Sequence, residues 1–299
     1  MSIRNNEDRT GERLETAASA PPPMPGAGSE ASPSMTLDFT CPTEFVDLPS
    51  RGRFYPEGHP LYGRESVEIR FMTAKDEDIL TSKSLLKKGV AIDRFLQNII
   101  VDKSIKLSDM FIGDKNALVV AARVTGYGAN YATKTTCPAC GNTQEYQFNL
   151  EEKKIKEGGL DTVKLHTPAL VEDIEETSDN TWVVECPRSK VKVELRLLTG
   201  AHEKFLLKSQ AMKKKQKLPE AGLTDQLRQT IVSVNGDTKP GNINRFIDVM
   251  PAMDSRFLRG IYENLMPKVD LTQHFECQSC DFEQDMEVPF TTDFFWPKR

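Results

Sequence analysis

Short stretches in which hydrophobic and polar residues alternate predict β-strands, because successive side chains of a strand point to opposite faces. One such stretch is Val67–Phe71. Two more, Trp182–Glu185 and Val191–Leu198, are separated by a short turn that contains proline, so we expect a β-hairpin there. Alternation also follows two Cys-x-x-Cys motifs, over residues 144–150 and 282–290, which predicts the outgoing strand of a hairpin after each motif.

Apolar residues at helical spacing predict helices between these strands. Ile92–Val101 places its apolar side chains on one face, which is typical of a helix that packs on a core. A helix is also predicted to follow Thr73 and to run to about Lys88, because Thr73 and Asp76 form a capping box and Gly89 stops the helix. Helices together with hairpins indicate a mixed α+β fold.

The chain repeats part of its pattern, which indicates two related copies of one unit. Val67–Thr73 and Val193–Thr199 are identical at four of seven positions, and the other three are apolar in both. Further matches follow at growing separations and include Asp114 and Asp254, at each of which we expect a helix to begin. Growing separation is expected of two copies that differ by loop insertions.

Four of the six cysteines lie in two Cys-x-x-Cys motifs that are far apart in the sequence. Cys137 and Cys140 form the first motif, and Cys277 and Cys280 form the second. Together they supply four thiolates, which complete a tetrahedral zinc site and leave no position for water. We therefore predict one structural Zn²⁺ that joins the two copies in the manner of a zinc ribbon.

Other roles for the cysteines and histidines fit the pattern less well. Redox-active dithiols are expected at the start of a helix that follows a strand, whereas these motifs lie between strand-like stretches. His274 lies three residues before the second motif, but four cysteines already complete the ligand shell. Cys41 and Cys186 are interpreted as free thiols, and His59 as a turn residue.

Composition divides the chain into four parts. Residues 1–40 are rich in Ala, Pro and Gly, and we expect them to form a flexible, extended N-terminal arm. Residues 41–150 and 181–299 are predicted to be the two repeats, each with one zinc knuckle, and residues 151–180 a charged linker. The second repeat ends in an aromatic tail, Phe294–Trp296, which we expect either to dock on a partner or to fold back onto the core of this chain.

Charge and motif content argue against several classes of function. The net charge of −5 disfavours a general nucleic-acid binder, and we interpret the lysines of Lys213–Lys217 as the favourable positive charge at a helix C-terminus. No apolar run of roughly 18 residues predicts a membrane span, and the N-terminus lacks the apolar segment of a secretory signal. No phosphate-binding, dinucleotide-binding, nucleophile-elbow or metalloprotease motif occurs, so we expect neither catalysis nor a small-molecule substrate.

Two segments of the first copy are distinctive together: Leu48–Pro56 (LPSRGRFYP) and Met72–Leu80 (MTAKDEDIL). With the motif Cys137–Cys140, they resemble the T4-type baseplate protein family of contractile-tailed bacteriophages, which are hub or assembly components of the tail. The resemblance implies a late structural protein that contacts other baseplate and tail proteins, is assembled in the host cytoplasm and resides in the virion. It agrees with the absence of a catalytic set.

The favoured interpretation is a structural baseplate subunit with a rigid, zinc-joined double repeat, whose N-terminal arm and aromatic C-terminus bind partner proteins. Three alternatives stay open. The protein could be an assembly chaperone that is absent from the mature virion. It could be a zinc-ribbon nucleic-acid-binding protein, or a thiol oxidoreductase.

Overall fold

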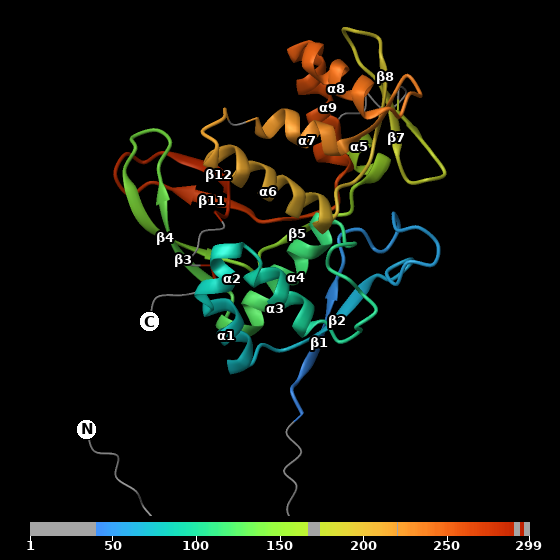
Figure 1. The fold of residues 1–299 in the computed structure, drawn as a ribbon. Coiled ribbons are helices and arrows are strands. Elements are labelled where there is room, and N and C mark those ends of the chain that lie inside the picture. The colour runs from blue at the N-terminus through green and yellow to red at the C-terminus, as the bar shows by residue number, and fades with distance from the viewer. Residues whose placement is uncertain (1–39, 167–173, 220, 290–293, 296–299) are drawn as a thin grey trace, which may run out of the picture. The chain divides into compact units, whose positions relative to one another are not determined.

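Helices and strands both contribute to the part of the chain that the computed structural model describes, which is residues 40–166, 174–219, 221–289 and 294–295. The strands are β1 (Thr43–Asp47), β2 (Ser66–Arg70), β3 (Asn130–Thr136), β4 (Thr143–Asn149), β5 (Lys154–Lys156), β6 (Ile174–Glu176), β7 (Trp182–Glu185), β8 (Lys192–Leu195), β9 (Ile231–Val234), β10 (Lys268–Asp270), β11 (Thr272–Glu276) and β12 (Glu283–Glu287). The helices are α1 (Ala74–Thr81), α2 (Lys83–Lys88), α3 (Ala91–Ile99), α4 (Ile112–Tyr127), α5 (Gly159–His166), α6 (Gly200–Lys215), α7 (Gly222–Thr230), α8 (Pro240–Val249) and α9 (Ala252–Leu265). The mixed α+β class is confirmed (Figure 1).

Two antiparallel arrangements carry the alternating stretches that the sequence predicted. β7 and β8 pair as the expected hairpin, with Val184 opposite Val193, inside a four-stranded sheet of order β6-β7-β8-β9. Trp182 and both of these valines are buried. β1 pairs with β2, where Val67 and Ile69 are buried on one face. The period-two pattern therefore identified the core-facing side of both hairpins.

The helix predicted to run to Lys88 is in fact two helices, α1 and α2. The backbone at Ser82 is extended, with ψ of 108°, and its carbonyl accepts hydrogen bonds from the amides of Leu85 and Leu86. These bonds begin α2 rather than continue α1. The predicted stop is confirmed, since Gly89 adopts a left-handed φ of 65° and its amide returns to the last turn of α2.

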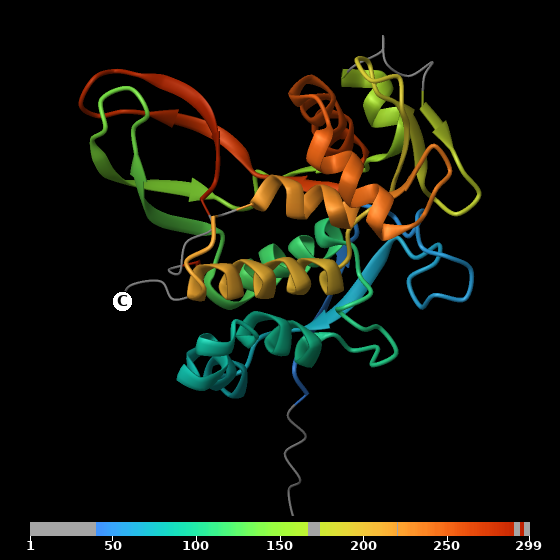
Figure 2. The ribbon, with the colours of Figure 1, turned by 45° about the horizontal axis from the view of Figure 1, so that its top comes forward.

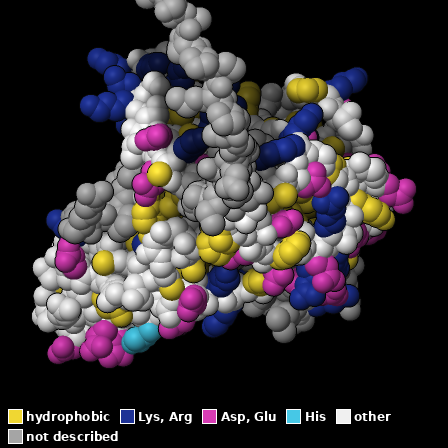
Figure 3. Space-filling view, turned by 90° about the horizontal axis from the view of Figure 1, so that it is seen from below, with side chains coloured by type: hydrophobic (Ala, Val, Ile, Leu, Met, Phe, Trp, Pro, Cys, Tyr) yellow, Lys and Arg dark blue, Asp and Glu magenta, His cyan; other side chains and the backbone are white. Residues whose placement is uncertain are grey.

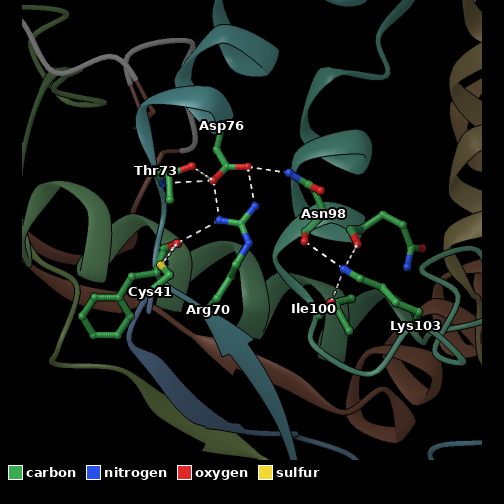
Figure 4. Close-up of polar contacts among 9 residues, drawn as sticks. Cys41, Arg70, Thr73, Asp76, Asn98, Ile100 and Lys103 are labelled. Atoms are coloured by element: carbon green, nitrogen blue, oxygen red, sulfur yellow. Dashed lines mark hydrogen bonds and ion pairs between the residues drawn. The ribbon is translucent and has the colours of Figure 1, made fainter. Parts of the chain in front are cut away.

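Asp76 secures the start of α1, as the capping box predicted. Its carboxylate accepts hydrogen bonds from the amide and hydroxyl of Thr73 at 2.9 and 2.8 Å. Arg70 of β2 donates to both carboxylate oxygens at 2.6 and 2.8 Å, and Asn98 of α3 donates at 2.7 Å (Figure 4). Burial raises the pKa of Asp76, but these hydrogen bonds outweigh burial and hold the pKa far below its usual range. One carboxylate thus joins β2, α1 and α3.

The helices expected to begin at Asp114 and Asp254 begin two residues earlier, so each aspartate is the third residue of its helix. Both side chains are fully buried. Asp114 accepts a hydrogen bond from the amide of Ser50 at 2.9 Å, and Asp254 accepts one from the amide of Ser189 at 2.9 Å. Each aspartate therefore ties its helix to the turn of an earlier hairpin from a position inside the first turn of that helix.

Residues from both halves of the chain contribute to one hydrophobic core. The rings of Phe54 and Trp182 meet edge to face, with centroids 5.4 Å apart. β5 pairs with β10, which places Ile155 opposite Val269. Residues 41–299 form one compact unit. The segment expected to be a charged linker carries β5, α5 and β6, and the division into two repeats remains a prediction.

The described part of the aromatic tail folds back onto this core. Phe294 and Phe295 are buried, and the rings of Phe95 and Phe295 meet edge to face at 5.6 Å. Arg123, itself buried, donates from Nε to the Phe294 carbonyl at 2.6 Å. These two residues are therefore part of the molecule's own interior. Trp296 and residues 1–39 of the expected arm lie outside the described residues.

The outer surface mixes charges of both signs. On the face shown in Figure 3, Lys and Arg side chains lie among Asp and Glu side chains, with scattered hydrophobic ones between them. Such interspersed charge is typical of a solvated protein surface. Among the described helices, none has the length and apolar character needed to cross a bilayer.

Candidate metal centre

Each cysteine motif forms the turn of a β-hairpin, as the flanking alternation predicted. The hairpin of β3 and β4 carries Cys137 and Cys140, and the hairpin of β11 and β12 carries Cys277 and Cys280. Figures 1 and 2 both show these hairpins side by side, although β4 ends at Asn149 and β11 begins only at Thr272. The fold thus brings together two motifs that are far apart in sequence.

The two turns have the same local geometry. The amide of Cys137 donates to the Asn142 carbonyl at 2.8 Å, and the amide of Cys277 donates to the Phe282 carbonyl at 2.9 Å. In each turn the residue after the second cysteine has a left-handed backbone, Gly141 with φ of 73° and Asp281 with φ of 50°. This conformation turns the chain sharply enough for both thiols of a motif to point to the same side.

All four sulfur atoms lie within 4.8 Å of one another. The Sγ atoms of Cys137 and Cys280 are 3.8 Å apart, and those of Cys140 and Cys277 are also 3.8 Å apart. Four sulfurs at about 2.3 Å from a tetrahedral zinc ion would lie about 3.8 Å from one another. The donor set and its spacing therefore fit a Zn²⁺ ion, and all four predicted ligands are brought together.

The site is half sheltered from solvent. Cys137 and Cys277 are buried, while Cys140 and Cys280 are exposed. The buried pair packs with Phe275 in a small apolar cluster that Tyr146 partly covers. The apolar side lowers the local dielectric, and the exposed side leaves a path for an ion to enter or leave.

The thiols differ in how readily they ionise. Hydrogen bonds from the backbone amides of Cys140 and Ala139 lower the pKa of Cys137 to about 7. For Cys280, the Phe282 amide lowers the pKa, but the neighbouring thiols, Cys140 first among them, outweigh it and raise the pKa to about 12. A thiolate at Cys137 would therefore oppose ionisation of the neighbouring Cys280. A divalent cation would remove that repulsion and favour four thiolates.

Side chains that the sequence patterns did not single out bind the hairpins to each other. Gln144 of β4 accepts a hydrogen bond from the Gln278 amide at 2.9 Å and donates to the Glu276 carbonyl at 2.9 Å. Gln273 of β11 accepts from the Asn149 amide at 3.0 Å and donates to its carbonyl at 2.6 Å. Each glutamine side chain thus bonds to one backbone N–H and one backbone carbonyl of the other hairpin, as a neighbouring strand would. Gln144 lies at the start of the alternating stretch after the first motif, but alternation alone does not identify a contact between hairpins.

The other residues considered from the sequence lie outside this centre. The ring of His274 faces Glu283 and Asp285, with nitrogen to oxygen distances of 3.7 and 3.5 Å. The thiol of Cys41 donates to the Phe71 carbonyl at 3.3 Å, and Cys186 is buried in the hydrophobic core. In the described residues, the group able to hold a metal consists of the four motif cysteines.

Comparison with known proteins agrees with the resemblance seen in the first copy and extends it. The model of a family described as T4 bacteriophage base plate protein matches residues 42–296, a span that contains both cysteine motifs. No curated protein and no solved structure matches this chain significantly. Because the match covers most of the chain, the protein belongs to the T4 bacteriophage base plate protein family.

Proposed function

We propose that the protein is a structural subunit of a contractile phage tail baseplate, with two repeats joined by one structural Zn²⁺ ion. Membership of the family indicates a structural rather than enzymatic role, contact with other phage tail proteins and a place in the virion. One observation carries the zinc proposal. The two 3.8 Å sulfur contacts each join a thiol of one motif to a thiol of the other.

Zinc is the metal that best suits this donor set. Four thiolates select zinc or iron–sulfur chemistry over magnesium and calcium, which prefer oxygen ligands. Four protein ligands close the tetrahedron, so no position remains for a substrate or a reactive water. Cys137, Cys140, Cys277 and Cys280 would hold the ion, and its role would be to stabilise the protein. Both motifs lie in hairpin turns, which disfavours a redox dithiol at a helix start.

The order of elements supports the two-repeat interpretation. β1, β2, α1, α3, α4 and the β3–β4 hairpin follow the same order as β7, β8, α6, α7, α9 and the β11–β12 hairpin. Asp114 and Asp254 occupy the same position in α4 and α9 and bind the turn of the first hairpin in each series. Such a specific long-range contact is not expected to arise twice from helix and strand content alone.

An ion shared by the two motifs would restrain the ends of both repeats. In small zinc peptides such a site contributes on the order of 10 to 16 kcal/mol at neutral pH, comparable with the stability of a typical domain. The hydrogen bonds between the hairpins do not depend on the metal, so they would still hold the hairpins together when the metal is lost. We infer that the ion stiffens a body that has to keep its shape under the load of a contracting tail.

Quantitative mass spectrometry of purified mature particles tests the role. We expect this chain to be assembled into tails in the host cytoplasm. In mature particles it should occur at a fixed ratio to other tail proteins. Presence in infected cells and assembly intermediates, with complete absence from mature particles, would instead identify an assembly chaperone. Salt-dependent binding of DNA or RNA by the purified chain would favour a zinc-ribbon nucleic-acid-binding protein.

A further inference from the structure

Helices α3 and α6 flank α4 (Figure 2). Residues of α2, α3, α4 and α6 line a groove along α4. It consists of two adjoining hollows of about 750 and 590 Å³. Both hollows are lined by Val90, Asp93, Lys115 and Lys204, so they form one continuous surface. The groove is a different site from the cysteine centre, because none of the four cysteines lines it.

The centre of the groove is held by a buried ion-pair cluster. Lys115 of α4 contacts Asp93 of α3 at 2.6 Å and Glu203 of α6 at 2.7 Å. Burial alone would lower the pKa of Lys115, but the two carboxylates outweigh burial and raise it. This cluster fixes the spacing of the three helices. It also occupies both acidic side chains that line the groove.

The rest of the charge in the groove is positive. Seven cations line it and form no ion pair within the described residues: Lys87, Lys88, Arg94, Lys103, Lys106, Lys204 and Lys208. The ammonium group of Lys103 donates to backbone carbonyls. They stand in a protein whose net charge is −5. A row of unpaired cations along a hollow raises the local concentration of anionic partners and speeds their association.

Apolar side chains occupy the same groove and restrict the class of partner. Leu86 is 44% exposed, Ile92 38% and Leu207 56%. They come from both walls, and Val119 of α4 lies between them. Grooves that bind single-stranded nucleic acid typically combine positive charge with aromatic side chains that stack on the bases. No aromatic residue lines either hollow. Apolar contacts flanked by unpaired lysines instead match a protein segment with one apolar side and acidic flanks.

We propose that this groove is the docking site for an acidic amphipathic helix of another baseplate protein. The apolar side of that helix would cover Leu86, Ile92 and Leu207, and its carboxylates would pair with the lysines at the rim. The helix-in-groove mode suits a hollow bounded by helices on both sides. The identity of the partner as a baseplate protein rests on the function proposed above, whereas the chemistry of the groove does not.

A synthetic peptide tests the chemistry with the purified full-length chain. The probe is a fluorescently labelled peptide with Leu and Ile at helical i, i+3, i+4 and i+7 spacing and Glu at the other positions. Its scrambled isomer and a single-stranded DNA oligonucleotide of equal charge are the comparisons. We expect the amphipathic peptide to bind at least about tenfold more tightly than either. Equal binding of the scrambled isomer, or preferred binding of DNA, would overturn the proposal.

Charge reversal locates the binding to the groove. We expect Lys87→Glu, Lys204→Glu and Lys208→Glu together to weaken peptide binding by about tenfold or more. The matched control reverses three exposed lysines outside the groove, Lys214→Glu, Lys215→Glu and Lys217→Glu, and should change the affinity by less than about twofold. Equal loss in both variants would place the site elsewhere. Leu207→Asp, a single change at an exposed position, gives the same test if the triple variant does not fold.

Photo-crosslinking during infection tests the partner. A photoreactive amino acid at Leu207 in the groove is compared with one at Leu218, which is 51% exposed and does not line the groove. We expect Leu207 alone to crosslink to an acidic segment of another tail protein. Crosslinks to nucleic acid, to a second copy of this chain or to its own N-terminal residues would contradict the proposal, as would a yield no higher than at Leu218. Presence of the chain in mature particles is scored separately, so the two proposals can fail independently.

Discussion

Asp114 in the first half of the molecule and Asp254 in the second occupy the same position in their helices, but their hydrogen-bond partners differ. Asp114 accepts hydrogen bonds from the Ser50 amide at 2.9 Å, the Ser50 hydroxyl at 2.6 Å and the Tyr55 hydroxyl at 2.7 Å. Asp254 accepts two backbone amides, those of Arg188 at 2.8 Å and Ser189 at 2.9 Å. Both carboxylates join the start of a helix to a hairpin turn.

The difference in partners changes the charge state that each site favours. Burial raises the pKa of Asp114, and the hydrogen bonds from Ser50 and Tyr55 do not cancel that effect. Burial acts on Asp254 as well, but hydrogen bonds from Ser189 and Arg188, with the charge of Arg188, lower its pKa. The shared feature is therefore the contact between helix and hairpin, while the electrostatics of that contact vary between the two halves.

The largest expected effect on stability comes from the cysteine centre, where the two halves are proposed to share one zinc ion. Cys137→Ser and Cys277→Ser each remove one ligand, so we expect each to abolish tight zinc binding and to lower the free energy of unfolding by several kcal/mol, roughly. Because both ligands would hold the same ion, the two losses should be equal. Chemical denaturation in the presence of zinc measures them.

The control for that comparison is Cys41→Ser, which removes a thiol that lies outside the cysteine centre, donates to the Phe71 carbonyl and interacts with Arg70. It should leave zinc content unchanged and cost less than about 1 kcal/mol. A chelator should destabilise the wild-type chain and this control alike, and have little further effect on either ligand variant. A large loss for Cys277→Ser alone would separate the two halves and contradict the shared ion.

Replacing each buried aspartate by asparagine should produce a smaller and unequal effect. At Asp254 both partners are backbone amides, so one of them would face the asparagine NH₂ group and lose its acceptor, at a cost of about 2 to 3 kcal/mol. At Asp114 the hydroxyls of Ser50 and Tyr55 can reorient, so the cost should be about 1 kcal/mol or less. Urea denaturation at neutral pH compares the variants, and equal costs would show that the hydroxyls do not adapt.

Acidification should change the stability contributions of the same two aspartates in opposite directions. A folded-state pKa below the ordinary 3.8 means that Asp254 contributes stability above that pH, which is lost as the pH falls. A raised folded-state pKa means that Asp114 contributes stability below 3.8, which is lost as the pH rises through its folded-state pKa. Asp254→Asn should therefore lose less stability than wild type on acidification, and Asp114→Asn should lose more.

Each variant is compared with wild type at the same pH and zinc concentration, so that protonation of the thiolates affects all three proteins equally. Parallel pH profiles for wild type and both variants would show that neither aspartate carries the predicted shift.

The smallest effect compares the two cysteine turns. Gly141 has open space where a Cβ would lie, so Gly141→Ala should cost only the strain of a left-handed backbone, about 1 kcal/mol. Asp281 already bears that strain, and Asp281→Gly should raise the free energy of unfolding by up to about 0.5 kcal/mol. Thermal unfolding of the zinc-bound chain measures both. The same sign of change in both turns would mean that the two turns are not equivalent.

Features specified by neighbouring residues could be predicted from the sequence. The capping box of Thr73 and Asp76 and the stop at Gly89 depend on three or four residues of chain, and both are present. The two cysteine motifs depend on equally short spacings, and the repeated pattern indicated that the motifs belong together. Their four sulfurs are in fact adjacent.

Contacts between distant segments could not be predicted in the same way. Gln144 binds Glu276, 132 positions away, and Arg123 binds Phe294, 171 positions away. Nothing in a local pattern distinguishes such side chains from ordinary surface residues. Lys115 is the clearest example, because a lysine in a helix is expected in solvent, and only Asp93 and Glu203 on other helices account for its burial. The groove that this lysine organises was therefore invisible at the sequence level.

Native mass spectrometry of the purified chain and of its Cys137→Ser and Cys277→Ser variants tests whether the two motifs share one ion. We expect one zinc ion bound to each monomer of the wild-type chain, and none bound to either variant under the same conditions. Two ions per monomer, zinc bound only in a dimer, or an ion that survives the loss of one motif would contradict a single centre shared by the two halves.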